Sequence, residues 1–283
     1  MISNFMRDLK ENRGALIGLF VCLFFLAISI FGPLLAPFSP SELTDNLTLG
    51  PFWTEGSVSS HILGTDDMGR DTLSRLLHAS RVSLFIGFFV VIISSTVGVI
   101  LGVLAGFYGG RIDHLVMRSM DVLMALPSIL LAIVVVSILG PGLENAILAV
   151  AVVSIPSFTR IVRASVLEEK EKDYVKAARI FGTSDLKIMF TEILPNCMAP
   201  LIIQITLGFS DGILNAAALS FLGLGAQPPT AEWGIMLSDS RAYIESSPWM
   251  VTLPGLCILS VVLGFNLLGD GLRDILDPRL KKG

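Results

Sequence analysis

Charged side chains are scarce in this sequence. Only 16% of its 283 residues are Asp, Glu, Lys or Arg, whereas 53% are hydrophobic, and the mean hydropathy is +0.75. A soluble domain usually carries about 25% charged residues, so most of this chain must face lipid or other apolar segments. The net charge of −4 is small and no basic patch with interleaved aromatic residues is present, so nothing points to a nucleic-acid partner.

Motifs of catalysis are also missing. The sequence contains no HExxH, no GxSxG and no GxxxxGK[ST] phosphate loop. His61, His78 and His114 are scattered along the chain and cannot be combined into a metal site. We therefore expect no enzyme activity and no metal or cofactor on this chain. If ATP drives the protein, another chain must bind the nucleotide.

Cysteine is rare, and its three positions share one environment. Cys22, Cys197 and Cys257 lie within or at the edge of apolar runs. Their odd number and the absence of CxxC argue against a disulfide framework or a metal knuckle. We expect them to be small buried apolar side chains.

Six stretches are long and apolar enough to cross a bilayer, whose core needs about 20 apolar residues in a helix. They cover residues 14–36, 82–107, 115–139, 143–161, 197–222 and 250–268. The first is longer than the apolar core of a signal peptide, which is roughly 7–15 residues, so it is predicted to be an uncleaved span. The chain is predicted to be an all-α polytopic membrane protein.

Lys and Arg are distributed unevenly around these spans. With the N-terminus inside, sixteen of the twenty fall on the inner side and four fall outside, namely Arg70, Arg75, Arg81 and Arg241. Cytoplasmic loops carry an excess of Lys and Arg. This bias predicts that both termini and the polar insert between the fourth and fifth spans are cytoplasmic.

The outer segment before the second span divides into two parts. Residues 37–60 are rich in Pro, Ser, Thr and Gly, as expected of an irregular loop. In residues 72–80 the side chains of Leu73, Leu76 and Leu77 fall on one helix face. We expect this short helix to lie on the outer membrane surface, with contact to an external partner as the alternative.

Two groups of residues inside the spans suggest specific contacts. Gly98, Gly102 and Gly106 recur at intervals of four, which lets another helix approach closely. Asp211 and Asn215 lie one turn apart in the fifth span. Charged groups at membrane depth usually face the bundle interior or a water-filled cavity. This pair either lines a translocation pathway or holds helices together by hydrogen bonds.

The polar insert at residues 168–195 is predicted to form two helices. Residues 166–181 favour a helix that stops at Gly182 in the left-handed conformation. A second helix then continues to about residue 192 and ends at Pro195. One face of the first helix carries four side chains at helical spacing, namely Tyr174, Ala177, Ala178 and Phe181. This face is either a knob for a partner's groove or the apolar side of a solvated helix.

The insert resembles the EAA loop of ABC importer permeases in a framework of five residues, Ala177, Ala178, Gly182, Leu194 and Pro195. Lys176 stands where the motif carries Glu, so the individual contacts differ from the family pattern. In that family the loop, here residues 163–196, forms a coupling helix that docks on the ATPase subunit. The resemblance implies that eight residues serve this coupling, namely Tyr174, Ala177, Ala178, Arg179, Phe181, Gly182, Leu194 and Pro195.

Three further segments, residues 63–76, 218–234 and 265–278, resemble the peptide/nickel branch of these permeases, and within it the C-type subunit of dipeptide transporters. The resemblance implies the type I ABC importer permease fold in a bacterial inner membrane. It also implies a homologous B-type permease, two cytoplasmic ATPases that bind ATP and Mg, and an extracytoplasmic binding protein. The chain would then form half of a pore that imports dipeptides or similar small peptides.

The resemblance also predicts a division of the chain into two parts. Residues 1–81 would hold the first span and the extracytoplasmic loop, and residues 82–283 the permease core with five spans. Haem, glutathione, longer peptides and nickel stay open as substrates. A self-sufficient secondary transporter is the competing class, and it would need ion-coupling residues, for which Asp211 is the one candidate.

Overall fold

The computed structural model describes residues 7, 9 and 11–276, whose regular elements are helices. In this part of the chain five helical segments are long and apolar enough to span a membrane: α2 (Arg13–Leu35), α3 (Thr72–Tyr108), α6 (Leu143–Glu169), the rod Asp185–Phe221 and α11 (Trp249–Leu276). A bent pair, α4 (Gly110–Met124) and α5 (Ser128–Leu139), supplies a sixth span if it counts as one. The predicted all-α polytopic fold is confirmed.

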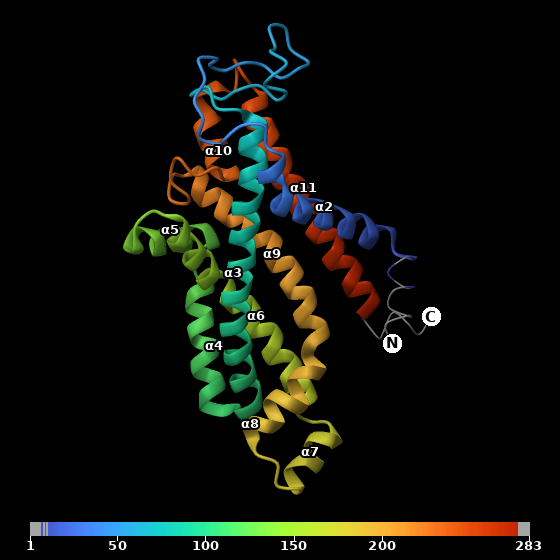
Figure 1. Ribbon diagram of the computed structural model, residues 1–283. Coiled ribbons are helices and arrows are strands. Elements are labelled where there is room, and N and C mark those ends of the chain that lie inside the picture. The colour runs from blue at the N-terminus through green and yellow to red at the C-terminus, as the bar shows by residue number, and fades with distance from the viewer. Residues whose placement is uncertain (1–6, 8, 10, 277–283) are drawn as a thin grey trace.

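Helix α3 stands at the centre of the bundle (Figure 1). It packs along α6, and it also contacts α2, α4 and α9 (Met198–Phe221). Helices α2 and α11 run side by side away from the centre (Figure 1). The irregular outer segment and α10 (Trp233–Ser240) cover one end of the molecule, and the insert forms the opposite end (Figure 1).

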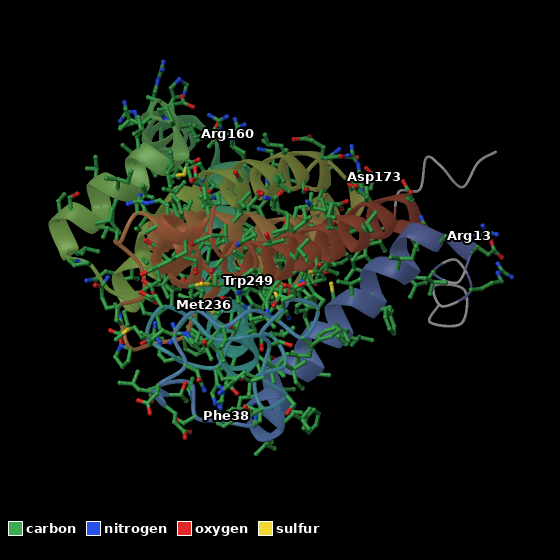
Figure 2. All side chains as sticks on the ribbon, turned by 90° about the horizontal axis from the view of Figure 1, so that it is seen from above. Arg13, Phe38, Arg160, Asp173, Met236 and Trp249 are labelled. Atoms are coloured by element: carbon green, nitrogen blue, oxygen red, sulfur yellow. The ribbon has the colours of Figure 1, made fainter. Side chains whose placement is uncertain are left out.

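The outer end is held by buried charges and a buried tryptophan. Arg70 and Arg75, which are 5% and 2% exposed, both pair with Asp66 at Nε–Oδ2 distances of 2.6 and 3.4 Å. Trp233 is fully buried and its Nε1 donates to the Leu76 carbonyl oxygen at 3.4 Å. The Trp233 hydrogen bond joins two segments that lie far apart in the sequence. In the view from above, Met236 and Trp249 lie between Phe38 and Arg160 (Figure 2).

The prediction of a separate surface helix over residues 72–80 is wrong. These residues are the first turns of α3 and continue straight into the second span. Asp71 caps the helix, since its Oδ2 accepts from the Ser74 N–H at 2.8 Å. Leu76 and Ala79 are buried under the outer segment and α10 rather than facing lipid headgroups. Distant residues thus cover Leu76, whereas Leu73 and Leu77, the other two leucines of the predicted face, are partly exposed.

The third predicted span, residues 115–139, is not straight. It breaks between Met124 and Ser128, and the two helices meet at an angle of 93°. Pro127 stands at the break with an extended ψ of 137°. Proline lacks the N–H that a continuing helix needs, and it disfavours the helical conformation in the residue before it. The length and apolar character of this stretch predicted a span, but not the angle at Pro127.

The fourth span is longer than predicted, and the division of the chain into two parts stays a prediction. Helix α6 continues to Glu169, eight residues beyond the predicted end at Ile161. The expected division between residues 81 and 82 falls inside α3, so the residues on its two sides share one helix. Lys10, Arg279, Lys281 and Lys282, which contributed to the charge count, lie outside the described residues.

The glycine series of α3 lies against α6. A Cβ atom built on Gly102 would lie 2.7 Å from the carbonyl oxygen of Thr159, and one on Gly106 would lie 3.0 Å from that of Arg163. At Gly98 it would overlap Phe158. The two backbones therefore approach so closely that the first added carbon collides with the partner helix.

We predict that Gly102→Ala lowers the stability of the protein by about 1–3 kcal/mol, because overpacking forces two backbones apart. Gly255→Ala in α11 is the matched control, since its Cβ would meet its nearest neighbour at an ordinary 3.8 Å. The thermal unfolding midpoint of each variant in detergent measures the effect. Equal midpoints for the two variants would contradict the close contact.

Candidate coupling site

The insert begins with a sharp break after α6. Helix α6 ends at Glu169, residues 170–172 form a turn, and α7 spans Asp173–Ile180. The predicted continuous helix over residues 166–181 is therefore wrong, and α7 is only eight residues long. The break is stabilised by Glu169, whose carboxylate accepts hydrogen bonds from the side chains of Lys172 and Tyr174 beyond the turn.

Helix α7 stops where the sequence predicted. Gly182 has a φ of +77°, in the left-handed region. The Thr183 N–H donates to the Ala178 carbonyl and the Gly182 N–H to the Arg179 carbonyl, both at 3.0 Å. This pair of bonds is a Schellman motif, which satisfies the last carbonyls of a helix. Glycine is favoured here because a side chain in this conformation is strained.

Tyr174 is the polar centre of the insert. Its hydroxyl donates to Glu169 Oε2 at 2.8 Å and accepts from Asn196 Nδ2 at 3.3 Å. Burial and the hydrogen bond to Glu169 raise the pKa of Tyr174 to about 12. The hydrogen bond to Glu169 also raises the pKa of Lys172. The network joins the end of α6, the start of α7 and the start of the fifth span.

The four residues of the face predicted on α7 differ in their burial. Tyr174 and Ala178 pack against a buried cluster that contains Val175, itself fully buried, whereas Phe181 is 86% exposed. Phe181 still belongs to the helical hydrogen-bond pattern, since its N–H donates to the Ala177 carbonyl at 3.0 Å, but the buried cluster does not cover its side chain. Its exposed apolar neighbour is Ile180, at 83%.

Arg179 and Lys170 hold the insert against the inner end of α3. The Arg179 guanidinium lies 5.0 Å from the centroid of the Phe107 ring, a cation–π contact. Lys170 Nζ donates to the carbonyl oxygen of Gly106 at 2.8 Å. Helix α7 thus contacts the inner end of the central helix directly.

Two ion pairs that sequence reasoning missed join α6 to α4 on the same side of the molecule. Arg163 forms a bidentate pair with Asp113, whose Oδ2 lies 2.7 Å from Nη2. Arg160 Nη2 lies 2.7 Å from Asp121 Oδ1. In the sequence these four residues looked like ordinary charges at span ends, because nothing in their spacing shows which carboxylate each arginine meets.

Leu194 and Pro195 lie inside a continuous helical rod, so the prediction that the second helix ends at Pro195 is wrong. The rod includes α8 (Asp185–Lys187), a wide π turn at Ile188–Ile193 and a 3₁₀ turn at Leu194–Cys197 before α9. The Leu194 N–H donates five residues back to Met189. Pro195 stands in the first positions of the 3₁₀ turn, where a missing N–H costs little. Leu194 packs on the buried cluster and Pro195 is exposed.

Among the described residues, Asp211 and Asn215 form no hydrogen bond or ion pair that joins two helices. Asn215 Nδ2 donates to the backbone carbonyl of Asp211 in its own helix at 2.8 Å. The Asp211 side chain is exposed, and no described residue donates to its carboxylate or pairs with it. A carboxylate at this depth is costly in lipid, so another chain or water must cover it.

No group of three His, Cys, Asp or Glu side chains that could hold a metal ion occurs in the described part of the chain. Cys22, Cys197 and Cys257 are free thiols, and Cys197 is buried. The geometry of the insert thus offers no reaction chemistry. It offers a short exposed helix end that is fixed to the bundle and available for contact.

Comparison with known proteins identifies the class to which this architecture belongs. Residues 98–282 match the family described as the binding-protein-dependent transport system inner membrane component. Residues 1–51 match the N-terminal transmembrane domain of oligopeptide transport permease C. The chain belongs to this permease family.

Relatives with similar sequences span almost the whole chain. The dipeptide transport system permease protein DppC of Haemophilus influenzae is 53% identical over 96% of this chain and 93% of its own length. The di/tripeptide permease of Pseudomonas aeruginosa is 53% identical over 99% and 93%. The glutathione permease GsiD of Pectobacterium atrosepticum is 44% identical over 97% and 90%.

The fold also resembles a solved structure, the inward-facing MetNI methionine ABC transporter. The TM-score is 0.56 at 20% identity, over 71% of this chain and 96% of that one. The protein is therefore a multi-pass inner-membrane component of a binding-protein-dependent ABC transporter, with an ATPase and a binding protein as partners. It is not an enzyme and carries no cofactor. The competing class of secondary transporter is excluded.

We predict that one of the three tyrosines titrates near pH 12. This titration step should be absent from the Tyr174→Phe variant. The raised pKa of Tyr174 means that the neutral phenol, which donates to Glu169, is favoured in the folded protein. The contribution of this hydrogen bond to the free energy of unfolding is fully present below about pH 10, the ordinary tyrosine pKa. It disappears as the pH rises toward 12. The phenolate absorbance difference between wild type and Tyr174→Phe measures this pKa. A midpoint near 10 would contradict the buried network.

Proposed function

We propose that this chain is one of two homologous permease subunits that form the pore of a dipeptide importer. The observation that carries the proposal is the similarity to dipeptide permeases at 51–53% identity over nearly the whole chain. A B-type permease would form the other half of the pore. Two cytoplasmic ATPases would drive transport, and an extracytoplasmic binding protein would deliver the peptide.

The exposed end of α7 supports the proposed contact with an ATPase. Ile180 and Phe181 are apolar yet more than four-fifths exposed, and Leu186, five residues further along the chain, is 65% exposed. Exposed apolar patches on the polar side of a membrane protein are typical of interaction sites. A groove on the ATPase would bury these side chains.

The contacts of α7 define how movement of an ATPase would reach the pore. Arg179 and Lys170 hold the insert on the inner end of α3, and Tyr174 connects it to α6 and the fifth span. A nucleotide can shift the pore only if the docked insert prefers different conformations in different nucleotide states. Displacement of α7 would then act on three spanning segments together.

We predict that Gly182→Pro and Ala178→Arg each abolish uptake while the protein stays in the membrane. Proline cannot adopt the positive φ of Gly182 and removes its N–H bond to Arg179. Arginine at position 178 places a charge against the buried cluster that seats α7. Gly182→Asn is the control, because asparagine tolerates this conformation. Uptake of labelled dipeptide into proteoliposomes that contain the complete transporter measures the effect. Normal uptake by both variants would overturn the docking role.

We predict that Asp211→Asn lowers dipeptide uptake about tenfold, as expected when one charge-assisted hydrogen bond is lost. In this proposal the exposed carboxylate lines the pathway and receives the peptide's ammonium group. Asp45→Asn, an exposed carboxylate of the outer loop, is the matched control. Uptake at equal membrane abundance is compared for the two variants. If Asp211→Asn transports as well as Asp45→Asn, Asp211 has no part in the pathway.

Glutathione is the second candidate substrate, since a glutathione permease is 44% identical to the chain. Both candidates are small peptides, so the same pore could pass either one. We expect proteoliposomes with the cognate binding protein to take up labelled dipeptide when ATP is enclosed, and to stop when ATP is omitted. Competition by excess glutathione, with no competition by dipeptides, would assign the chain to glutathione instead.

A further inference from the structure

Four arginines belong to the outer side of the protein, and three of them have partners. Arg70 and Arg75 pair with Asp66, and Arg241 lies over the ring of Phe221 at 5.9 Å from its centroid. The exposed guanidinium of Arg81 has neither a carboxylate nor an aromatic partner among the described residues. The protein itself thus leaves one outer positive charge uncompensated in the described chain.

Arg81 occupies a defined depth in the membrane. It is followed by residues 82–107, the predicted second span, which contain no Asp, Glu, Lys or Arg. At 1.5 Å per residue, such a stretch is about 39 Å long and covers a hydrocarbon core of about 30 Å. Because the stretch is longer than the core is thick, Arg81 lies at or just outside the outer boundary of the hydrocarbon, at the level of the lipid headgroups.

An apolar groove descends from Arg81 into the membrane. Its volume is about 320 Å³, and Arg81 is the one charged residue in its wall. The other wall residues include leucines of α2 and phenylalanines of α3, α9 and α11, namely Leu23, Leu26, Phe85, Phe88, Phe209 and Phe265. Phe85 and Phe88 follow Arg81 at i+4 and i+7, so they continue the same face of α3 toward the membrane centre.

We propose that this groove binds an anionic phospholipid of the outer leaflet of the inner membrane. Arg81 holds the phosphate, and one acyl chain lies along the groove between α2 and α3. A guanidinium matches phosphate oxygens with two parallel hydrogen bonds. Leu26 and Phe88 are 50% and 53% exposed, and an acyl chain would cover them.

Charge and depth favour a lipid over other occupants. A soluble anion would use Arg81 but would leave the apolar groove below it empty. An apolar protein helix would fill the groove but would leave Arg81 without a counter-charge at the headgroup level. A phospholipid supplies both parts in the correct order along the membrane normal. The proposal depends on the membrane topology of the chain, and not on which substrate it transports.

The test measures lipid retention by the intact transporter. The complete complex is reconstituted in phosphatidylcholine nanodiscs that contain phosphatidylglycerol, extracted, and analysed by native mass spectrometry for bound lipid. We expect Arg81→Gln to lower phosphatidylglycerol retention about tenfold, the effect of one charge-assisted contact. Leu26→Trp, which fills the groove and keeps Arg81, should lower it as well. Arg241→Gln is the matched control and should retain the lipid.

Three outcomes would overturn the proposal. The first is equal phosphatidylglycerol retention by Arg81→Gln and Arg241→Gln. The second is equal retention of phosphatidylcholine and phosphatidylglycerol by the unmodified protein. The third is loss of another transporter subunit from Arg81→Gln with unchanged lipid, which would assign this face to a subunit interface. Each outcome is measured as the mass of lipid or subunit that stays bound to the protein. It is therefore distinct from a failure of dipeptide uptake.

Discussion

The close contact between α3 and α6 is the constraint on which the rest of the structure depends. Gly102 and Gly106 remove the side chains that would separate the two helices. Helix α3 begins under the outer segment at Thr72 and ends where the insert is held, and α6 leads into that insert. Because the two helices are locked together, the outer cover and the insert share one rigid support.

Several charges at the ends of the spanning helices have a partner within the described chain. At the outer end Arg75 is buried beside Asp66, and at the inner side Arg163 forms a bidentate pair with Asp113. Removing one member of a buried pair leaves an uncompensated charge, which costs far more than the pair contributes. Asp211 and Arg81 depart from this arrangement. Each therefore marks a surface that something outside this chain has to cover.

The sequence predicted five of the six spans and the stop at Gly182 well, because apolar length and a left-handed glycine are local properties. It failed where distant residues decide the outcome. The leucines near residue 76 indicated a membrane-surface helix, yet Trp233 folds over them from far along the chain. Pro195 indicated a helix end, yet it stands in the first positions of a 3₁₀ turn within the continuous rod. Tyr174 was recognised, but its partners Glu169 and Asn196 carry no spacing that connects them to it.

By itself the sequence determined that the protein crosses a membrane, which side its insert occupies, and that it contains no motif for binding ATP. These properties follow from hydrophobicity, from the counts of Lys and Arg and from a missing motif, which need no knowledge of contacts. The tertiary structure decided which face of α7 is buried, which carboxylate each arginine meets and where a charge remains free beside an apolar groove. Each of these depends on side chains that are distant in sequence and adjacent only after folding.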